Sequence, residues 1–337
     1  MSIYTKFFLA FISLPLMFNT AMANDLNKRE DIQLFISEMQ QKHGFDKTSL
    51  EKLFANTRLQ PSIIKAITRP AEKKPWHAYR PIFLTQSRIE LGVEFWDKHA
   101  DLLKQAHQQY GVDPEIIVGI IGVETRYGRH TGNYRVIDAL ATLGFDYPPR
   151  SKFFRSELKH YLLMTREENV DPLSLKGSYA GAMGQPQFIS SSFRSYAIDF
   201  DKDGKRDIWN NPADAIGSVA NYLARHGWQR GKKITQTITP STNTDKKLLL
   251  EKALQPSHTV TSLRQKGFIG IDKKIADDAV AAVINLEGKT APEHWLGLKN
   301  FYVITRYNHS ALYAMAVYQL AQEIRQRRQL AENAQDA

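Results

Sequence analysis

The stretch that decides the fold reads Asp113-Pro114-Glu115-Ile116-Ile117-Val118-Gly119-Ile120-Ile121-Gly122-Val123-Glu124-Thr125-Arg126-Tyr127-Gly128, and it predicts one short helix. An aspartate stands at the N-cap, a proline at the first helical position and a glycine at the exit. Between these ends the stretch is apolar on every face, which is the pattern of a helix buried on all sides. Gly119 and Gly122 each cost such a helix about 1 kcal/mol relative to alanine. We therefore expect another backbone or a ligand to approach this helix closely.

Glu124 is the unexpected residue of this stretch. The residues three, four and seven positions before it are all isoleucine, so its carboxyl shares an apolar stripe. An unpaired carboxylate in such a place loses hydration, which raises its pKa. This makes Glu124 a candidate proton donor near neutral pH. The alternative is a glutamate in the last helical turn that reaches solvent or pairs with Arg126 or Arg129.

The first 23 residues have the composition of a secretory signal peptide. Lys6 lies near the start, residues 7–18 are almost wholly apolar, and Ala21-Met22-Ala23 is a small-residue cleavage site. The alternative is a single membrane anchor, although the apolar run is short for a span. We expect cleavage after Ala23. Because the sequence has no cysteine that could carry a lipid, we expect a soluble protein of the bacterial periplasm.

Composition narrows the class of protein. The 337 residues are 42% hydrophobic and 24% charged, which is ordinary for a globular protein of two or three lobes. The absence of cysteine excludes disulfides, thiol nucleophiles and Cys-ligated metals. The net charge of +10, or +9 without the leader and its single Lys6, indicates an anionic partner. Nucleic acid is one such partner, but export favours a cell-wall polymer with free carboxylates on its peptides.

Apolar spacing predicts a mainly α protein of the α+β class. Helices are expected over residues 29–43, 81–110, 135–143, 151–169, 211–226 and 310–328, with a proline-rich connector over 70–81. Strand-like runs at 234–238, 281–286 and 301–305 predict a small sheet. We expect four parts after the leader: a helical lobe over 24–110 joined by the C-terminal helix 309–330, a core lobe over 111–230, an inserted β lobe over 231–308, and a tail over 331–337.

Two further segments look like walls of a binding cleft. Three glycines and a proline make a long helix unfavourable in Lys176–Phe188, so a tight loop should present Ser178, Gln187 and Phe188. The alternative is a glycine-rich surface turn. Tyr307 and Tyr313 are aromatic platforms with hydroxyls, a type of side chain that stacks on sugar faces. Asn308 between them is also a candidate, although capping of the last helix would explain it equally.

An acidic loop follows at Asp199-Phe200-Asp201-Lys202-Asp203-Gly204-Lys205-Arg206-Asp207-Ile208-Trp209-Asn210. Carboxylates at positions 1, 3 and 5 with glycine at position 6 match the start of an EF-hand calcium loop. The match fails at position 12, where Asn210 replaces a glutamate, but Asp214 could close a longer loop. The alternative is a solvated acidic turn that neighbouring lysines and an arginine neutralise.

Taken together, Ile121–Gly128, Gly181-Ala182-Met183-Gly184 with Gln187-Phe188, and the loop over 199–214 resemble the lytic murein transglycosylase B family. The order and spacing match over about Asp31 to Arg327. The resemblance implies a goose-lysozyme-like catalytic core lobe. It also implies cleavage of peptidoglycan between N-acetylmuramic acid and N-acetylglucosamine without water, leaving a 1,6-anhydro end. The family's single catalytic acid, which then acts as base, matches Glu124.

The resemblance also implies binding residues. Ser178 matches a contact to the muramic acetamide, and Gln187 a contact to the sugar or to Glu124. Further matches along the cleft are Tyr79, Arg150, Phe188, Tyr222, Tyr307, Asn308 and Tyr313. The matches for a structural Ca²⁺, the single expected cofactor, are Asp199, Asp201, Asp203, the Lys205 carbonyl and Asp214. Gln185-Pro186-Gln187 in place of Tyr-Gly-Gln, and Ile189-Ser190 in place of Met-Pro, depart from the family and indicate a reshaped wall.

Two other functions stay open at this point. A hydrolytic muramidase would use the same Glu124, with water replacing the C6 hydroxyl. A non-catalytic wall-binding protein would use the same cleft, although it has no need for an acid on an apolar stripe. The expected partners are glycan strands and other cell-wall synthesis or hydrolysis enzymes, with no nucleic acid and no membrane anchor.

Overall fold

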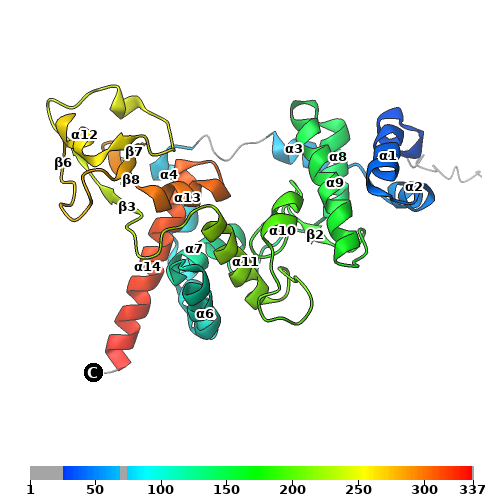
Figure 1. Cartoon of the computed structure of the whole chain (residues 1–337), viewed down its shortest axis with the longest axis horizontal. Coiled ribbons are helices and arrows are strands. Elements are labelled where there is room, and N and C mark those ends of the chain that lie inside the picture. The colour runs from blue at the N-terminus through cyan, green and yellow to red at the C-terminus, as the bar shows by residue number, and fades with distance from the viewer. Residues whose placement is uncertain (1–25, 69–73, 336–337) are drawn as a thin grey trace, which may run out of the picture. The chain divides into compact units, whose positions relative to one another are not determined.

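The computed structural model describes residues 26–68 and 74–335 (Figure 1). The predicted signal peptide and the end of the predicted tail lie outside these residues. The chain divides after Asn56 into two compact units. The described part of the first unit holds a short 3-10 turn (Leu26–Lys28), α1 (Glu30–His43) and α2 (Lys47–Ala55). Its core includes Phe35 and Phe54, whose rings meet edge to face at 6.0 Å.

Helices dominate the second unit, which begins at Thr57. They are α3 (Pro61–Ile67), α4 (Trp76–Phe83), α5 (Gln86–Lys98), α6 (Ala100–Tyr110), α7 (Pro114–Thr125), α8 (Val136–Asp146), α9 (Ser151–Glu167), α10 (Ser190–Tyr196), α11 (Pro212–Arg225), α12 (Val260–Gln265), α13 (Lys299–Tyr307) and α14 (Ala311–Gln335). The strands are β1 (Tyr134–Arg135), β2 (Lys176–Gly177), β3 (Thr235–Thr237), β4 (Thr239–Pro240), β5 (His258–Thr259), β6 (Phe268–Ile269), β7 (Val280–Leu286) and β8 (Glu293–Gly297). The mainly α prediction is therefore confirmed. Among the described residues, no helix is both long enough and apolar enough to cross a membrane.

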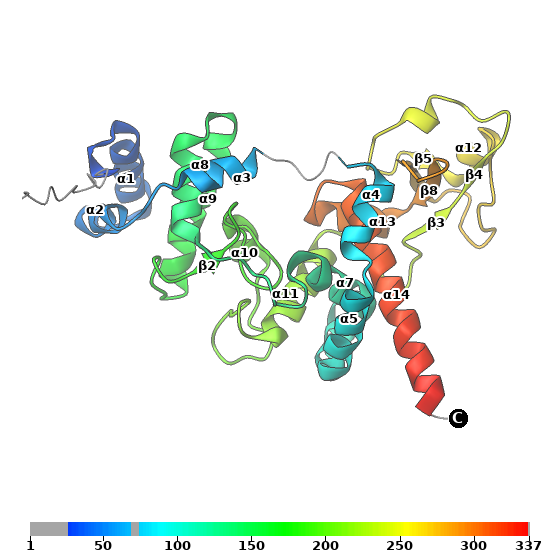
Figure 2. The same cartoon turned by 180° about the vertical axis from the view of Figure 1, so that it is seen from behind.

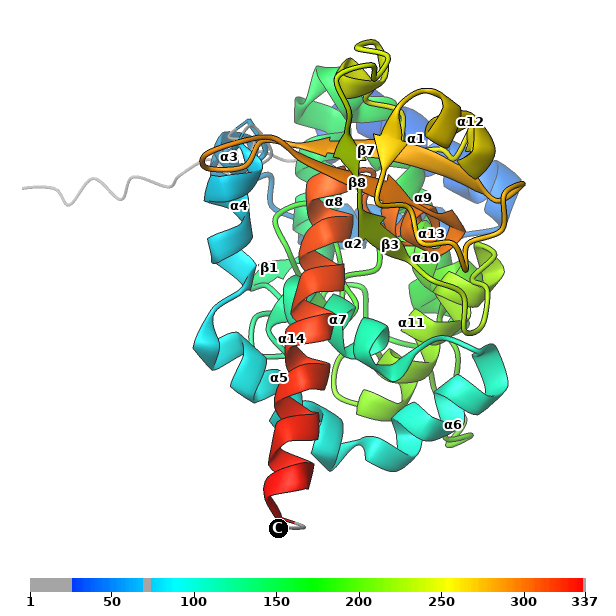
Figure 3. The same cartoon turned by 90° about the vertical axis from the view of Figure 1, so that its left-hand side faces the viewer.

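The helix predicted within Asp113–Gly128 is α7, and it is buried almost throughout. Helix α14 runs beside α7 and α5 (Figure 3), and α4 lies against α14 (Figure 2). Near the start of α7, Glu115 accepts a hydrogen bond from Arg325 of α14 at 3.0 Å. A Cβ added at Gly119 would lie 3.0 Å from the Val317 carbonyl oxygen and 3.2 Å from the Ala321 methyl carbon. The close backbone approach predicted for this glycine is thus confirmed. Asp113 stands at the N-cap, but its side chain makes no capping hydrogen bond.

The expected single helix over 81–110 is wrong. The chain forms α4, α5 and α6 there instead, and α4 already begins inside the expected connector. Thr85 starts a new helix because its hydroxyl accepts the Arg88 N–H. His99 then separates α5 from α6. Apolar spacing continues across both breaks, and therefore it did not reveal them.

The small sheet follows the helical part of the chain. Its four strands are antiparallel in the order β3-β8-β7-β5, and β4 pairs separately with β6. An apolar cluster that includes Val260, Leu263, Phe268 and Val283 forms its core. The strand expected at 301–305 is wrong, because these residues lie in α13. Phe301, Ile304 and Thr305 are fully buried and share one helical face, a spacing that a five-residue run cannot distinguish from a buried strand.

Substitution of Gly119 tests the contact between α7 and α14. Alanine at this position meets atoms at tight distances, whereas valine adds two methyl groups against a backbone carbonyl. We expect Gly119→Val to lower the free energy of unfolding by about 1–3 kcal/mol, as overpacking of a core does, and Gly119→Ala to cost less. Urea denaturation of the three proteins measures this order. A valine variant as stable as the wild type would contradict the close packing of the two helices.

Candidate active site

Glu124 lies in the last turn of α7, where the helix ends abruptly. Arg126 and Tyr127 both have left-handed backbone conformations, with φ of 52° and 61°. Their N–H groups close the helix by bonding the carbonyls of Gly122 and Ile121. The chain turns away at once, and this leaves the Glu124 side chain at the end of a buried helix with a partial opening to solvent.

Within residues 26–68 and 74–335, the carboxyl of Glu124 has one hydrogen-bond partner, the hydroxyl of Tyr313, which donates to Oε1 at 2.6 Å. Burial raises the pKa of Glu124 to about 7, and the Tyr313 hydrogen bond offsets part of that rise. In the described part of the chain Glu124 forms no ion pair, and the nearby Arg126 guanidinium donates to Ser87. The structure therefore does not support the alternative in which Glu124 simply reaches solvent or pairs with Arg126 or Arg129.

Aromatic side chains from three helices form a wall beside Glu124. The rings of Tyr307 and Tyr313 are nearly parallel, with centroids 6.4 Å apart. Tyr222 of α11 packs against Tyr307 at 4.8 Å, and Phe188 packs against both at under 6 Å. The hydroxyls of Tyr222 and Tyr307 are fixed, since each donates at 2.6 Å to a backbone carbonyl, that of Arg306 and that of Pro186 respectively.

The glycine-rich segment over Lys176–Phe188 adjoins this wall and forms a tight loop, as predicted. Ser178 Oγ accepts the N–H groups of Ala180 and Ala182, which folds the loop back on itself. Gly184 has φ of 67° and a Cβ there would lie 2.6 Å from the Ile208 carbonyl, so the loop requires glycine at this position. Gln187, also left-handed at 52°, donates through Nε2 to the carbonyls of Thr131 and Gly184.

Thr125 joins this loop to the helix that carries Glu124, and the sequence did not single it out. Its buried hydroxyl donates to the carbonyls of Gln185 at 2.9 Å and Ile121 at 3.2 Å, and it accepts the Gly128 N–H at 3.0 Å. One side chain thus connects α7, its exit turn and the glycine-rich loop. The sequence hinted at the importance of Thr125 only by its position directly after Glu124. The spacing of apolar residues that predicts α7 carries no information about contacts with the glycine-rich loop.

The remaining residues predicted to bind substrate, Tyr79, Asn308 and Arg150, lie in different parts of the structure. Tyr79 is buried in α4, which packs against α14, the helix that carries Tyr313. Asn308 caps α13 in a partly buried position. Arg150 is exposed, and its guanidinium lies over the ring of Phe153 at 4.4 Å. In the described residues Arg150 has no contact with the tyrosine wall, so its binding role stays a prediction.

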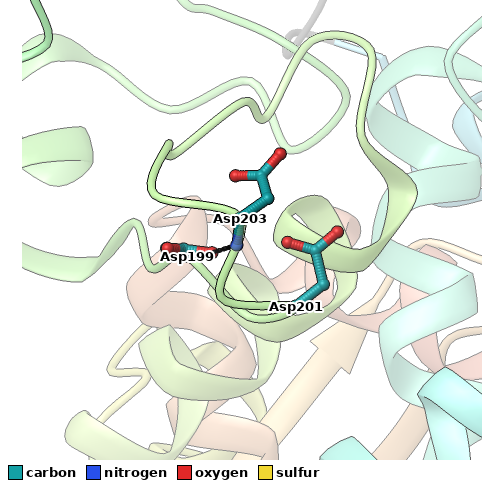
Figure 4. Close-up of side chains that lie close together, drawn as sticks. All are labelled: Asp199, Asp201 and Asp203. Carbon is teal, nitrogen blue, oxygen red and sulfur yellow. Dashed lines mark hydrogen bonds between the residues drawn. The ribbon is translucent and has the colours of Figure 1, made fainter.

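The acidic loop brings three carboxylates together. One oxygen from each of Asp199, Asp201 and Asp203 lies within 4.8 Å of the others. Figure 4 shows the three side chains on one turn, with the N–H of Asp203 donating to Asp199 at 3.0 Å. Gly204 provides the sharp turn with φ of 90°. Three converging carboxylate oxygens fit a hard cation such as Ca²⁺.

Asp214 differs from these three. It is fully buried in the first turn of α11 and accepts the N–H groups of Phe200 at 2.8 Å and Asp207 at 2.7 Å. These bonds tie the two ends of the acidic loop together. Asp214 lies outside the cluster of converging oxygens, and Lys205 is exposed with its N–H bonded to Asp203. Their roles as ligands stay predictions.

Comparison with known proteins gives the class to which this fold and site belong. The family model described as "Transglycosylase SLT domain" matches residues 27–322. The membrane-bound lytic murein transglycosylase B of Escherichia coli strain K12 is 42% identical over 313 residues, 90% of this chain and 85% of that protein. The chain belongs to this transglycosylase family.

Two solved structures agree closely with the fold. The catenated lytic transglycosylase SltB1 from Pseudomonas aeruginosa superposes with a TM-score of 0.86 at 51% identity, covering 90% of this chain and 100% of that chain. The Escherichia coli lytic transglycosylase Slt35 in complex with calcium superposes with a TM-score of 0.83 at 41% identity, covering 94% and 99%. The lysozyme-like prediction for the core is thus confirmed.

The hydrogen bond from Tyr313 stabilises the charged form of Glu124, so its removal should raise the pKa of Glu124 above about 7. We expect Tyr313→Phe to shift the ¹³C NMR titration of the Glu124 carboxyl to higher pH. Tyr318→Phe, on the same helix, is the matched control and should leave the titration unchanged. An unchanged midpoint in Tyr313→Phe would mean that this hydroxyl does not act on the carboxyl.

Proposed function

We propose that Glu124 is the single acid and base of the reaction of this lytic transglycosylase, which cleaves peptidoglycan strands between N-acetylmuramic acid and N-acetylglucosamine. The observation that carries the proposal is the carboxyl itself, which burial holds at a pKa of about 7 and which the Tyr313 hydroxyl orients. Near neutral pH such a group is present both as acid and as carboxylate. It can therefore give a proton in one step and take one in the next.

The reaction follows from these two states. Protonated Glu124 donates its proton to the glycosidic oxygen while the bond from this oxygen to C1 of the muramic sugar breaks. The N-acetylglucosamine end leaves with the proton as a hydroxyl. The Glu124 carboxylate then accepts the proton of the muramic C6 hydroxyl while O6 bonds to C1. The product carries a 1,6-anhydro ring, Glu124 is protonated again, and no water is consumed.

The cleft residues suit the parts that the family resemblance gives them. The oxygen of the Ser178 hydroxyl accepts two N–H groups, so its hydrogen remains for the carbonyl of the muramic acetamide. Both amide hydrogens of Gln187 are used on backbone carbonyls, and this leaves only Oε1 to accept from a sugar hydroxyl. Tyr307 is partly exposed, so a sugar can stack against its ring, whereas Tyr222 and Tyr313 are buried behind it. The hydroxyls of all three are fixed by hydrogen bonds.

A single carboxyl separates this reaction from ordinary glycoside hydrolysis. Retaining and inverting glycosidases use two carboxyl groups, one on each side of the bond. Among the described residues, no aspartate or glutamate acts on the pKa of Glu124; the effects are burial and Tyr313. This favours attack by the substrate's own C6 hydroxyl over attack by water.

We further propose that Asp199, Asp201 and Asp203 hold a structural Ca²⁺, with the Lys205 carbonyl and Asp214 as further ligands. The convergence of three carboxylates supports this, as does the calcium in the Slt35 structure, which is similar over nearly the whole chain. When bound, the ion would neutralise the loop and fix the turn that leads into α11, the helix that carries Tyr222.

The setting proposed for the enzyme is the bacterial periplasm, reached through a signal peptide over residues 1–23. The sequence contains no cysteine, so lipid attachment of the kind that tethers a protein through cysteine is not available to it. The proposed substrate is the glycan strand, and cell-wall synthesis or hydrolysis enzymes are proposed protein partners. We also propose the lobe boundaries given above, at residues 24–110, 111–230 and 231–308.

Glu124→Gln tests the catalytic assignment. Glutamine keeps the shape and can accept from Tyr313, but it cannot transfer a proton. We expect a loss of about 10²- to 10⁴-fold or more in turnover of purified peptidoglycan, with binding to it retained. In the wild type, turnover should fall as the pH rises through about 7, because the acid form is lost. Cleavage by Glu124→Gln near the wild-type rate would remove Glu124 from the mechanism.

Mass spectrometry of the soluble products identifies the reaction. Products of the wild-type enzyme lighter than hydrolytic muropeptides by one water carry the expected anhydro ring. Products that retain this water would make the protein a muramidase instead. If the wild type releases nothing and still binds the wall, the non-catalytic alternative takes precedence.

Thermal melting tests whether the acidic loop binds Ca²⁺. Added Ca²⁺ should raise the melting temperature of the wild type, because it binds the folded loop in preference to the unfolded chain. Asp203→Ala should remove this increase, whereas Asp278→Ala, which removes an exposed carboxyl elsewhere, should retain it. An identical calcium response in Asp203→Ala and wild type would leave the loop as an acidic turn without a bound ion.

A further inference from the structure

A pocket that shares no lining residue with the Glu124 site opens beside the small sheet. Its volume is about 450 Å³, and four lysines line it: Lys232, Lys233, Lys274 and Lys299. Among the described residues that line it, none is acidic. Its other walls are mainly apolar and include Ile275, Ala279, Val280 and Leu298. We refer to it as the lysine pocket.

Three chain segments build the lysine pocket, and each is fixed to the fold. Asn300, which is fully buried, holds the first segment by bonding the backbone of Gln229 in both directions at 2.8 Å and the Lys232 carbonyl at 3.1 Å. The Leu298 N–H holds the start of α13 by donating to the Ile234 carbonyl at 3.0 Å. The third segment is fixed where the Val260 N–H donates to the Ala279 carbonyl. The pocket is therefore part of the folded framework and not a gap between loose loops.

Its positive charge is only partly compensated. Lys233 pairs with Asp272 at 2.9 Å. In the described residues Lys232, Lys274 and Lys299 form no ion pair, and the Lys299 ammonium lies 5.5 Å from the ring of Tyr302. Three like charges around an apolar floor repel one another, and an anionic ligand would relieve that repulsion. The complementary ligand carries more than one carboxylate together with small apolar groups.

Helix α13 relates this pocket to the catalytic cleft. Its first residue, Lys299, lines the pocket, and its last, Tyr307, belongs to the aromatic wall beside Glu124. At 1.5 Å per residue these positions are about 12 Å apart along the helix axis. Helix α11 makes a similar link, because its Tyr222 belongs to the aromatic wall and the segment that follows it, with Gln229 and Lys232, lines the pocket. The pocket and the aromatic wall therefore lie at the two ends of one short helix, so that a polymer bound at the wall has its neighbouring groups near the pocket.

We propose that the lysine pocket binds the stem peptides of peptidoglycan through their free carboxylates, and so serves as a second, non-catalytic attachment site for the polymer. This inference rests on the proposed function, which supplies a substrate with carboxylate-bearing peptides repeated along each strand. The alanine methyl groups of such peptides suit the apolar floor. Because two weak contacts on one polymer reinforce each other, even a weak pocket raises the affinity for intact wall.

The test measures binding by full-length protein that carries Glu124→Gln, so that the polymer is not digested. Lys232→Glu with Lys274→Glu reverses two charges of the pocket. Lys246→Glu with Lys289→Glu makes the same change in net charge at exposed lysines that do not line the pocket. Each protein is sedimented with insoluble peptidoglycan, either intact or freed of its stem peptides by an amidase. Circular dichroism melting establishes that the variants are folded.

We expect the pocket variant to bind intact peptidoglycan about five- to tenfold more weakly than the control variant, as the loss of two exposed charge contacts implies. On peptide-free glycan the two variants should bind alike. Equal binding of both variants to intact peptidoglycan would overturn the proposal and would leave an acidic protein as the candidate occupant. An equal loss on peptide-free glycan would also overturn it, because the pocket would then contact the sugar chain.

These outcomes do not depend on catalysis. If the wild type fails to cleave peptidoglycan, the proposed reaction fails, while the binding comparison still reports on the pocket. If the binding comparison fails but anhydro products form, only the lysine pocket is in error. On short soluble peptide-free glycans, the pocket variant with Glu124 restored should show wild-type turnover, since no lysine of the pocket belongs to the catalytic cleft.

Discussion

The hydrogen bond between Tyr313 and Glu124 is the interaction on which the site depends. It joins the last turn of one buried helix to the first turn of another at 2.6 Å, across 189 residues of sequence. A carboxyl in so apolar a place needs an oriented donor, because a buried acceptor without a partner is costly. The packing of α7 against α14, with no side chain at Gly119, brings the two groups within reach. The hydroxyl orients the acid but does not neutralise it.

The glycine-rich loop beside Glu124 depends on a second polar contact inside an apolar setting. Thr125 uses both the donor and the acceptor capacity of its hydroxyl within one turn of the acid. This bond fixes the backbone at Gln185. It thereby also positions the next residue, Pro186, whose carbonyl accepts a hydrogen bond from the Tyr307 hydroxyl. The glycine-rich loop and the aromatic wall are thus held to the same helix end. Their relative position is set by backbone carbonyls, which explains why side-chain changes such as Gln185-Pro186 are compatible with the site.

The sequence allowed much of this site to be predicted, but not all of it. The buried α7 and the raised pKa of Glu124 follow from an apolar pattern that only a helix in the core satisfies. The tight loop at Ser178 and the acidic turn follow from glycine and aspartate positions. Thr125 could not be recognised, because its importance arises from a loop that lies 60 residues further along the chain. The strand expected at 301–305 failed for a related reason: a run of four apolar residues and a threonine fits either structure, and Asn300 with its three backbone bonds fixes the helix.

The long sequence separation between α7 and α14 also has a consequence for folding. Contacts between distant parts of a chain form late, because the loop between them must close first. Until α14 docks, Glu124 has no donor and the face of α7 around Gly119 is uncovered. A chain that lacks its last 27 residues therefore loses both the orienting hydroxyl and the cover of its central helix. The chemical competence of the enzyme therefore depends on the docking of its C-terminal helix.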